Sequence, residues 1–203
     1  VGSASPQTIC DETASNIALN STVAGTTYTW SAAIQTTPTG GTITGFSDCA
    51  SACGTSIAQT LTNTGTTSGV VRYTVTPTAN GCAGAPFTVD VTINPTPNAV
   101  ATPASQTICS ANAISTIVLS GAVSGTTYAW TRDNTASATG IAASGSGNIS
   151  GSLTNTTNAP VTVTFTITPT ANSCPGAAIT ATVLVNPTPN VVATTTSQTI
   201  CSG

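Results

Sequence analysis

The sequence predicts an all-β protein made of two tandem β-sandwich domains and the first strand of a third. One observation is compositional: the 203 residues include 46 threonines, no lysine, no methionine and a single glutamate. Threonine favours strands, whereas the missing residues are good helix formers. The other observation is a repeat. The stretch INPTPNAVATPASQTIC at 93–109 returns at 185–201 as VNPTPNVVATTTSQTIC, with 13 of 17 letters unchanged, which indicates an array of similar domains.

Strands of the first domain, predicted over residues 1–97, are marked by apolar residues at every second position. In chain order these are Ile17 and Leu19; Tyr28 and Trp30; Val71, Tyr73 and Val75; and Phe87, Val89, Val91 and Ile93. Period-two alternation places the apolar side chains on one face of a sheet. Short strands separated by Gly, Asn and Pro turns, with one tryptophan for the core, predict an immunoglobulin-like sandwich.

The second domain, predicted over 98–189, repeats the same signals. GTTYTW at 25–30 returns at 125–130 as GTTYAW, and VRYTVTPTANGC at 71–82 returns at 163–174 as VTFTITPTANSC. The offset between copies falls from 100 to 92 after the tryptophans, so the first copy carries an insertion around 45–54. A third QTIC at Gln198–Cys201 predicts that 190–203 begins a third repeat.

Seven cysteines, no histidine and no CxxC motif predict disulfides rather than a zinc site, and therefore an extracellular setting. The second copy has cysteines only at the positions that match Cys10 and Cys82. Comparison of the copies therefore predicts the bonds Cys10–Cys82 and Cys109–Cys174, with Cys49–Cys53 as a local bond in the insertion. Closing a loop of about seventy residues contributes about 4 kcal/mol in the chain-entropy model. Cys201 is expected to pair with a cysteine of a following domain.

The joint between repeats contains two prolines, Pro95 and Pro97, which recur as Pro187 and Pro189. Proline removes a backbone donor and fixes φ, so these residues should end the last strand and favour polyproline II. The joint is therefore predicted to be a semi-rigid spacer of about 15 Å.

The run YTVTPTANGCAGAPFTVDVTINPTPN, together with SQTIC and TTYTW, resembles the PKD-like, immunoglobulin-fold repeats of large secreted adhesins of surface-colonising bacteria. The resemblance covers both copies and implies a role as a stalk. It carries over no ligand site, because the acidic, glycine-rich turn that often follows the tryptophan in such domains is absent after Trp30 and Trp130.

Charge excludes several classes of function. Only 3% of residues are charged, and Arg72 and Arg132 are the only cations. Two arginines cannot form the basic surface that nucleic acid or anionic membranes require. No apolar run is long enough for a membrane helix.

Without histidine or lysine the chain lacks the usual groups that titrate near neutral pH, so neither catalysis nor a cofactor or metal is expected. The absence of methionine and of a leader pattern indicates a mature or internal segment.

These observations predict a structural segment of an extracellular adhesin stalk or surface filament, with neighbouring copies of the repeat as partners. The alternative is a pair of carbohydrate-binding modules attached to a secreted enzyme, with the loop around Gly45–Gly54 contacting a surface polysaccharide. Four aromatic residues are candidates for stacking on sugars, but their place on apolar strand faces favours core packing. They are Tyr28, Trp30, Tyr73 and Trp130.

Overall fold

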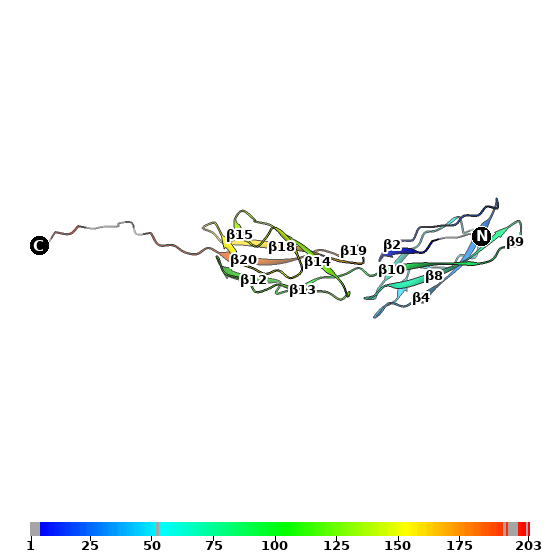
Figure 1. Cartoon of the computed structure of the whole chain (residues 1–203), viewed down its shortest axis with the longest axis horizontal. Coiled ribbons are helices and arrows are strands. Elements are labelled where there is room, and N and C mark those ends of the chain that lie inside the picture. Colours follow the sequence, from blue (N-terminus) through cyan, green and yellow to red (C-terminus); the bar gives the residue numbers. More distant parts are fainter. Residues whose placement is uncertain (1–4, 52, 193, 195–198, 202) are drawn as a thin grey trace. The chain divides into compact units, whose positions relative to one another are not determined.

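The computed structural model, drawn in Figure 1, describes residues 5–51, 53–192, 194, 199–201 and 203. Within these ranges the secondary structure consists of strands, turns and bends, with no helix. Consequently no described segment is a helix long and apolar enough to cross a membrane. The predicted all-β class is confirmed.

The main sheet of the first repeat has the strand order β1-β10-β8-β4, and β9 extends it as a hairpin partner of β8. The strands are β1 (Gln7–Cys10), β10 (Phe87–Asn94), β8 (Gly69–Ala79), β4 (Thr27–Thr36) and β9 (Cys82–Ala83). β1 runs parallel to β10, and the other pairs are antiparallel. From Gly69 to Val75 the burial of β8 alternates residue by residue as the sequence pattern predicted, because one face of the strand packs against the core.

Shorter strands form smaller sheets in the same repeat. They are β2 (Thr13–Ala14), β7 (Thr60–Asn63) and β5 (Ile43–Thr44) in one sheet, and β3 (Ile17–Ala18) and β6 (Ser56–Ile57) in another. Their apolar residues Ile17, Ile57 and Leu61 belong to one core cluster with Tyr73 and Val91 of the main sheet. The first repeat is thus a sandwich around a single core.

The second repeat has the same plan. Its main sheet follows the order β12-β20-β18-β14-β16, with β19 paired to β18. These strands are β12 (Ser105–Cys109), β20 (Ile179–Asn186), β18 (Val161–Ala171), β14 (Thr127–Arg132), β16 (Ser144–Ser146) and β19 (Cys174–Pro175). Two further pairs are β11 (Val100–Thr102) with β13 (Val118–Ser120), and β15 (Ala138–Gly140) with β17 (Leu153–Asn155). Trp130 packs edge-on against Phe165 in its core, with ring centroids 5.7 Å apart.

The chain divides into two compact units. One consists of Val1–Val100 together with Leu119–Ala129 and Ile167–Ile179, and the other of Ala101–Val118, Trp130–Thr166 and Thr180–Gly203. The first unit therefore includes two segments of the second repeat. Of the expected third repeat, Gln198 lies outside the described residues, and residues 199–201 form no strand.

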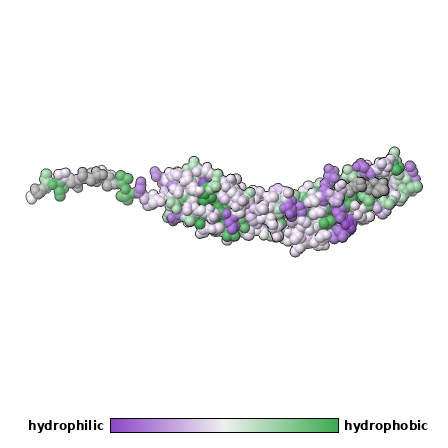
Figure 2. Space-filling model, viewed as in Figure 1, coloured by the Kyte–Doolittle hydropathy of each residue, from purple (hydrophilic) through white to green (hydrophobic). Residues whose placement is uncertain are grey.

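The surface reflects the composition. Most of the face in Figure 2 is pale, with small scattered patches of strongly hydrophilic or hydrophobic residues. Arg72 and Asp90 form a salt bridge across β8 and β10, in which Nε and Nη2 of the arginine donate to the two carboxylate oxygens at 2.7 and 2.8 Å. These hydrogen bonds hold the pKa of Asp90 below its ordinary value.

Candidate functional site: the Cys10–Cys174 disulfide

Cys10 is bonded to Cys174, with a Cα–Cα distance of 5.6 Å and a sequence separation of 164. The predicted bonds Cys10–Cys82 and Cys109–Cys174 are therefore wrong. Cys82, Cys109 and Cys201 are exposed free thiols. The predicted local bond Cys49–Cys53 is present.

Strand register explains why Cys10 does not reach Cys82. Cys10 lies opposite Asn94, at the end of the sheet where β8 begins with Gly69. Cys82 lies opposite Ala79, at the other end of β8. Ten residue steps along a strand span about 33 Å, whereas the Cα atoms of a disulfide lie about 4.4–6.8 Å apart. The two cysteines of one repeat are thus at opposite ends of its sandwich.

Cys174 is presented by a tight hairpin between β18 and β19. The two turn residues, Asn172 and Ser173, have φ values of 48° and 65°. Positive φ at both positions is the pattern of a type I′ turn, whose twist matches that of the strands. The first repeat places Cys82 after the same turn, with Asn80 at 50° and Gly81 at 77°.

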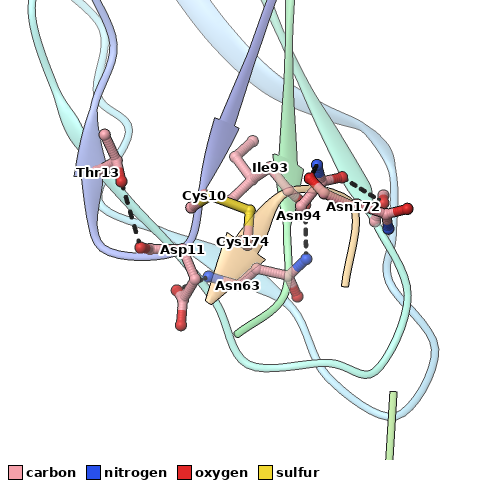
Figure 3. Close-up of a disulfide and its surroundings, with 9 residues drawn as sticks. Cys10, Asp11, Thr13, Asn63, Ile93, Asn94, Asn172 and Cys174 are labelled. Carbon is pink, nitrogen blue, oxygen red and sulfur yellow. Dashed lines mark hydrogen bonds between the residues drawn. A yellow bond between two sulfur atoms is a disulfide. The ribbon is translucent and has the colours of Figure 1, made fainter. Parts of the chain in front are cut away.

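Figure 3 shows the surroundings of this bond, with Cys10 at the end of β1 and Cys174 on β19. Beside the sulfurs, Asn94 Nδ2 donates to the Asn172 carbonyl at 3.3 Å. Cys174 is only 1% exposed. Every residue of this cluster belongs to the first compact unit. The bond therefore lies in a packed environment rather than on a free surface.

The proline joint is packed in the same region. Residues 95–99 form no strand, as the prolines predicted, but Pro95 and Pro97 are buried. A Cβ on Gly176 would lie 1.8 Å from the Pro97 carbonyl oxygen, so glycine permits this close approach. Asn98 Oδ1 accepts a hydrogen bond of 2.8 Å from the Ala122 amide. The joint is therefore a packed segment, and its predicted role as a semi-rigid spacer stays a prediction.

The insertion of the first repeat is also fastened to the core. Trp30 Nε1 donates to the Ser47 carbonyl at 3.2 Å, and the backbones of Trp30 and Cys49 form a bridge. Gln59 Nε2 donates to the same Ser47 carbonyl at 2.9 Å. The insertion thus covers the tryptophan edge. Its proposed contact with polysaccharide stays a prediction.

The aromatic residues considered for sugar stacking are buried, which confirms their predicted core packing. Their exposed fractions are 3% for Tyr28, 9% for Trp30, 0% for Tyr73 and 8% for Trp130. Within the described part of the chain, no cluster of three or more His, Cys, Asp or Glu side chains could hold a metal ion.

Comparison with known families identifies the repeat. A family model described as "PKD-like domain" matches residues 7–97 and again 106–189. The chain belongs to the PKD-like domain family. Two PKD-like domains in tandem are consistent with an extracellular structural module. No curated protein matches the chain in sequence.

The solved structures that match the chain are distant from it in sequence. The Ig1+Ig2 domains of DIP-gamma match with a TM-score of 0.45 and 9% identity, over 94% of this chain and 97% of that chain. Mouse cadherin-23 EC22–24 matches with a TM-score of 0.41 and 14% identity, over 90% of this chain and 63% of that one. Fibronectin(III)-like modules of Clostridium thermocellum CbhA match with a TM-score of 0.36 and 8% identity, over 92% and 95%.

Sequence reasoning missed the pairing because both repeats of this chain carry both cysteine positions. Comparison of two copies shows that the positions belong together, but not whether the bond closes one repeat or joins two. A signal was available in the strand pattern. Counting residues from 69 to 79 shows that Cys82 lies a full strand length from Gly69, but only the register of β1 against β10 places Cys10 at the Gly69 end.

Proposed function

We propose that this chain is a structural segment of an extracellular adhesin stalk or surface filament, in which disulfides bond successive PKD-like repeats to one another. The observation that carries this proposal is the Cys10–Cys174 bond, because it joins the first matched repeat to the second. Disulfides and immunoglobulin-like domains support an extracellular location. The role is mechanical and not enzymatic, in keeping with a family whose domains are typically non-catalytic.

The bond changes how a pulling force passes through the chain. A force applied at the two termini enters at residue 1, crosses from Cys10 to Cys174 through the sulfurs, and leaves at residue 203. Residues 11–173 lie inside the closed loop and cannot be extended. Only residues 1–9 and 175–203 can lengthen. A stalk with this bond would keep its reach even when one of its domains unfolds.

Single-molecule pulling on the termini tests the proposal. Without reductant, the chain should lengthen by no more than ~140 Å in total, which is the span of the residues outside the loop. The Cys10→Ser/Cys174→Ser double variant should extend to roughly 700 Å, the span of the whole chain.

A matched control is the Cys49→Ser/Cys53→Ser variant, which loses a disulfide but should keep the short extension. Full extension of the wild-type chain without reductant would contradict the proposal. So would peptide mapping that recovers Cys10 bonded to Cys82.

A further inference from the structure

The β8–β9 hairpin of the first repeat and the β18–β19 hairpin of the second are equivalent in sequence but differ in exposure. Cys174 is 1% exposed, whereas Cys82 is an exposed thiol. In the adjoining loop Val123 is 7% exposed, whereas its counterpart Val23 is 51% exposed. Something covers this end of the second repeat that is missing from the first. We call this part of each repeat the hairpin end.

The uncovered hairpin end forms a cavity of about 490 Å³. Its lining includes Val23, Thr26, Pro77, Asn80, Cys82 and Gly84. The repeat offsets match these to Val123, Thr126, Pro169, Asn172, Cys174 and Gly176 of the second repeat. The cavity therefore occupies the place that has a cover in the second repeat.

That cover is the joint that leaves the first repeat. Pro97 lies against Gly176, Asn98 bonds to Ala122, and Asn94 bonds to the Asn172 carbonyl beside the disulfide. All these contacts lie within the first compact unit. We call the Asn-Pro-Thr-Pro-Asn segment that leaves a repeat, together with the QTIC cysteine that lies opposite its first asparagine in the sheet, the joint end of that repeat. In the first repeat this cysteine is Cys10, opposite Asn94.

The joint end of the second repeat is uncovered in its turn. Asn94 is 6% exposed, whereas its counterpart Asn186 is only partly buried. Pro97 is buried, whereas its counterpart Pro189 is exposed. Cys109 lies opposite Asn186, as Cys10 lies opposite Asn94, but it is an exposed thiol. The chain thus has one covered pair of ends, one open hairpin end and one open joint end.

We infer that the cavity at Cys82 receives the joint end of another PKD-like repeat, and that Cys82 forms a disulfide with the QTIC cysteine of that repeat. Cys109 would bond in the same way to another hairpin end. The two thiols lose two protons and two electrons as the S–S bond forms, and a small disulfide such as oxidised glutathione is reduced to two thiols. This inference rests on the proposed function in assuming that repeats are joined in series.

At one position that touches the joint, the open cavity differs from the covered one. Gly121 allows the Asn98 carbonyl oxygen to approach, since a Cβ there would lie 2.3 Å from it. The first repeat has Ser21 at this position. An incoming joint end must therefore shift slightly at Ser21, and the Ser21→Gly variant should bind it more tightly.

The chain itself supplies both probes, because one copy offers Cys82 and another offers Cys109. In a Cys201→Ser background and a glutathione redox buffer, the chain should form multimers joined by Cys82–Cys109 bonds, identified by peptide mapping under non-reducing conditions. With Cys82→Ser or Cys109→Ser added, each variant should stay monomeric. A mixture of these two variants should give a dimer and nothing larger.

Gly84→Ala tests whether docking in the cavity directs the bond. In the chain by itself a Cβ here meets atoms of Pro77, with the ring carbon Cγ at 3.1 Å and the carbonyl oxygen at 3.6 Å. By analogy with Gly176, it would collide with the incoming proline carbonyl. The Cys82–Cys109 bond should therefore form at least tenfold more slowly, while alkylation of Cys82 by iodoacetamide keeps its rate.

Two results would overturn the inference. One is a random mixture of Cys82–Cys82, Cys109–Cys109 and Cys82–Cys109 bonds, and the other is an unchanged rate in Gly84→Ala. In both cases an intact Cys10–Cys174 bond in the same peptide map would leave the proposed function standing. If the Cys10–Cys174 bond were also missing from the map, both this inference and the proposed function would be contradicted.

Discussion

At the scale of single residues, a buried asparagine holds each sandwich closed. Asn155 Nδ2 donates to the carbonyls of Ala159 and Val185 at 2.7 and 2.8 Å, and its Oδ1 accepts from the Thr157 amide. Asn63 makes the equivalent bonds in the first repeat, including one of 2.8 Å to the Ile93 carbonyl. Both asparagines belong to an LTNT motif, found at 61–64 and again at 153–156, which thus ties a loop to the last strand of its repeat.

Replacing Asn155 with alanine should therefore destabilise the second repeat. The change removes four side-chain hydrogen bonds, including the one that the Thr157 hydroxyl donates to Oδ1 at 2.8 Å, and leaves the buried Val185 carbonyl without this partner, at a cost of about 2–4 kcal/mol. Urea unfolding followed by tryptophan fluorescence measures it. The exposed Asn158→Ala is the control and should stay within about 0.5 kcal/mol of the wild type. Equal effects of the two changes would contradict the role given to Asn155.

Tyr73 predicts a dependence on alkaline pH. Its hydroxyl donates to Gln59 Oε1 at 2.8 Å, and burial raises its pKa from 10.0 to about 12. The folded protein therefore holds this proton more tightly than the unfolded chain. The resulting stability is fully present below pH 10 and is lost as the pH rises to about 12.

The Tyr73→Phe variant tests this dependence, and phenylalanine already occupies the equivalent position, Phe165. At pH 7 the variant should be less stable by about 1 kcal/mol, because Gln59 loses a hydrogen bond. Between pH 10 and 12 the difference from the wild type should shrink or reverse. The measurement is the melting temperature of both proteins across this pH range. A difference between wild type and variant that does not change with pH would contradict the raised pKa of Tyr73.

At the scale of elements, the two hairpins differ at one turn position. Ser173 adopts a φ of 65°, which is unfavourable for a residue with a Cβ, whereas the first repeat has Gly81 there at 77°. Asn at the first turn position tolerates this conformation in both hairpins. The hairpin that carries the bonded cysteine is thus the more strained of the two.

Ser173→Gly should consequently stabilise the protein by about 0.5–1 kcal/mol, and Gly81→Ser should destabilise it by a similar amount. Chemical denaturation of both single variants measures the effect. The pair forms its own control, since the same exchange is made in opposite directions at equivalent sites. Changes of the same sign in both variants would refute the explanation.

At the scale of the whole molecule, the Cys10–Cys174 bond closes a loop over most of the chain. Loop closure of this length contributes about 5 kcal/mol in the chain-entropy model. If bonds of the same kind followed in series, successive loops would overlap, because Cys109 lies inside the loop that Cys174 closes. A cut in the backbone would then leave the stalk covalently continuous.

The loop closed by Cys10–Cys174 allows a test of covalent continuity after a backbone cut. A protease recognition site inserted after the exposed Thr135 lies between Cys10 and Cys174. After cleavage, the chain should run as one species on a denaturing gel without reductant, and as two fragments with it. The same insertion in Cys10→Ser should give two fragments under both conditions. Separation of the wild-type fragments without reductant would show that the bond is not formed.

Much of the fold followed from the sequence because it depends on local patterns. Alternation at Val71, Tyr73 and Val75 predicted a strand with one buried face, and the buried residues of β8 follow that pattern. The local bond Cys49–Cys53 was predicted correctly because its two cysteines have no counterpart in the second copy and lie within one insertion. The role of Asn63 was not predicted, since the motif LTNT does not say which carbonyl its amide meets.

The sequence by itself determined the β class, the tandem repeats and the PKD-like family, because these depend on period-two alternation and on recurring motifs. Only the tertiary structure decided which cysteines bond and where the proline joint packs. The physical reason is that a disulfide requires proximity in space. The ends of strands far apart in the chain meet only when sheet register and the packing of the joint bring them together.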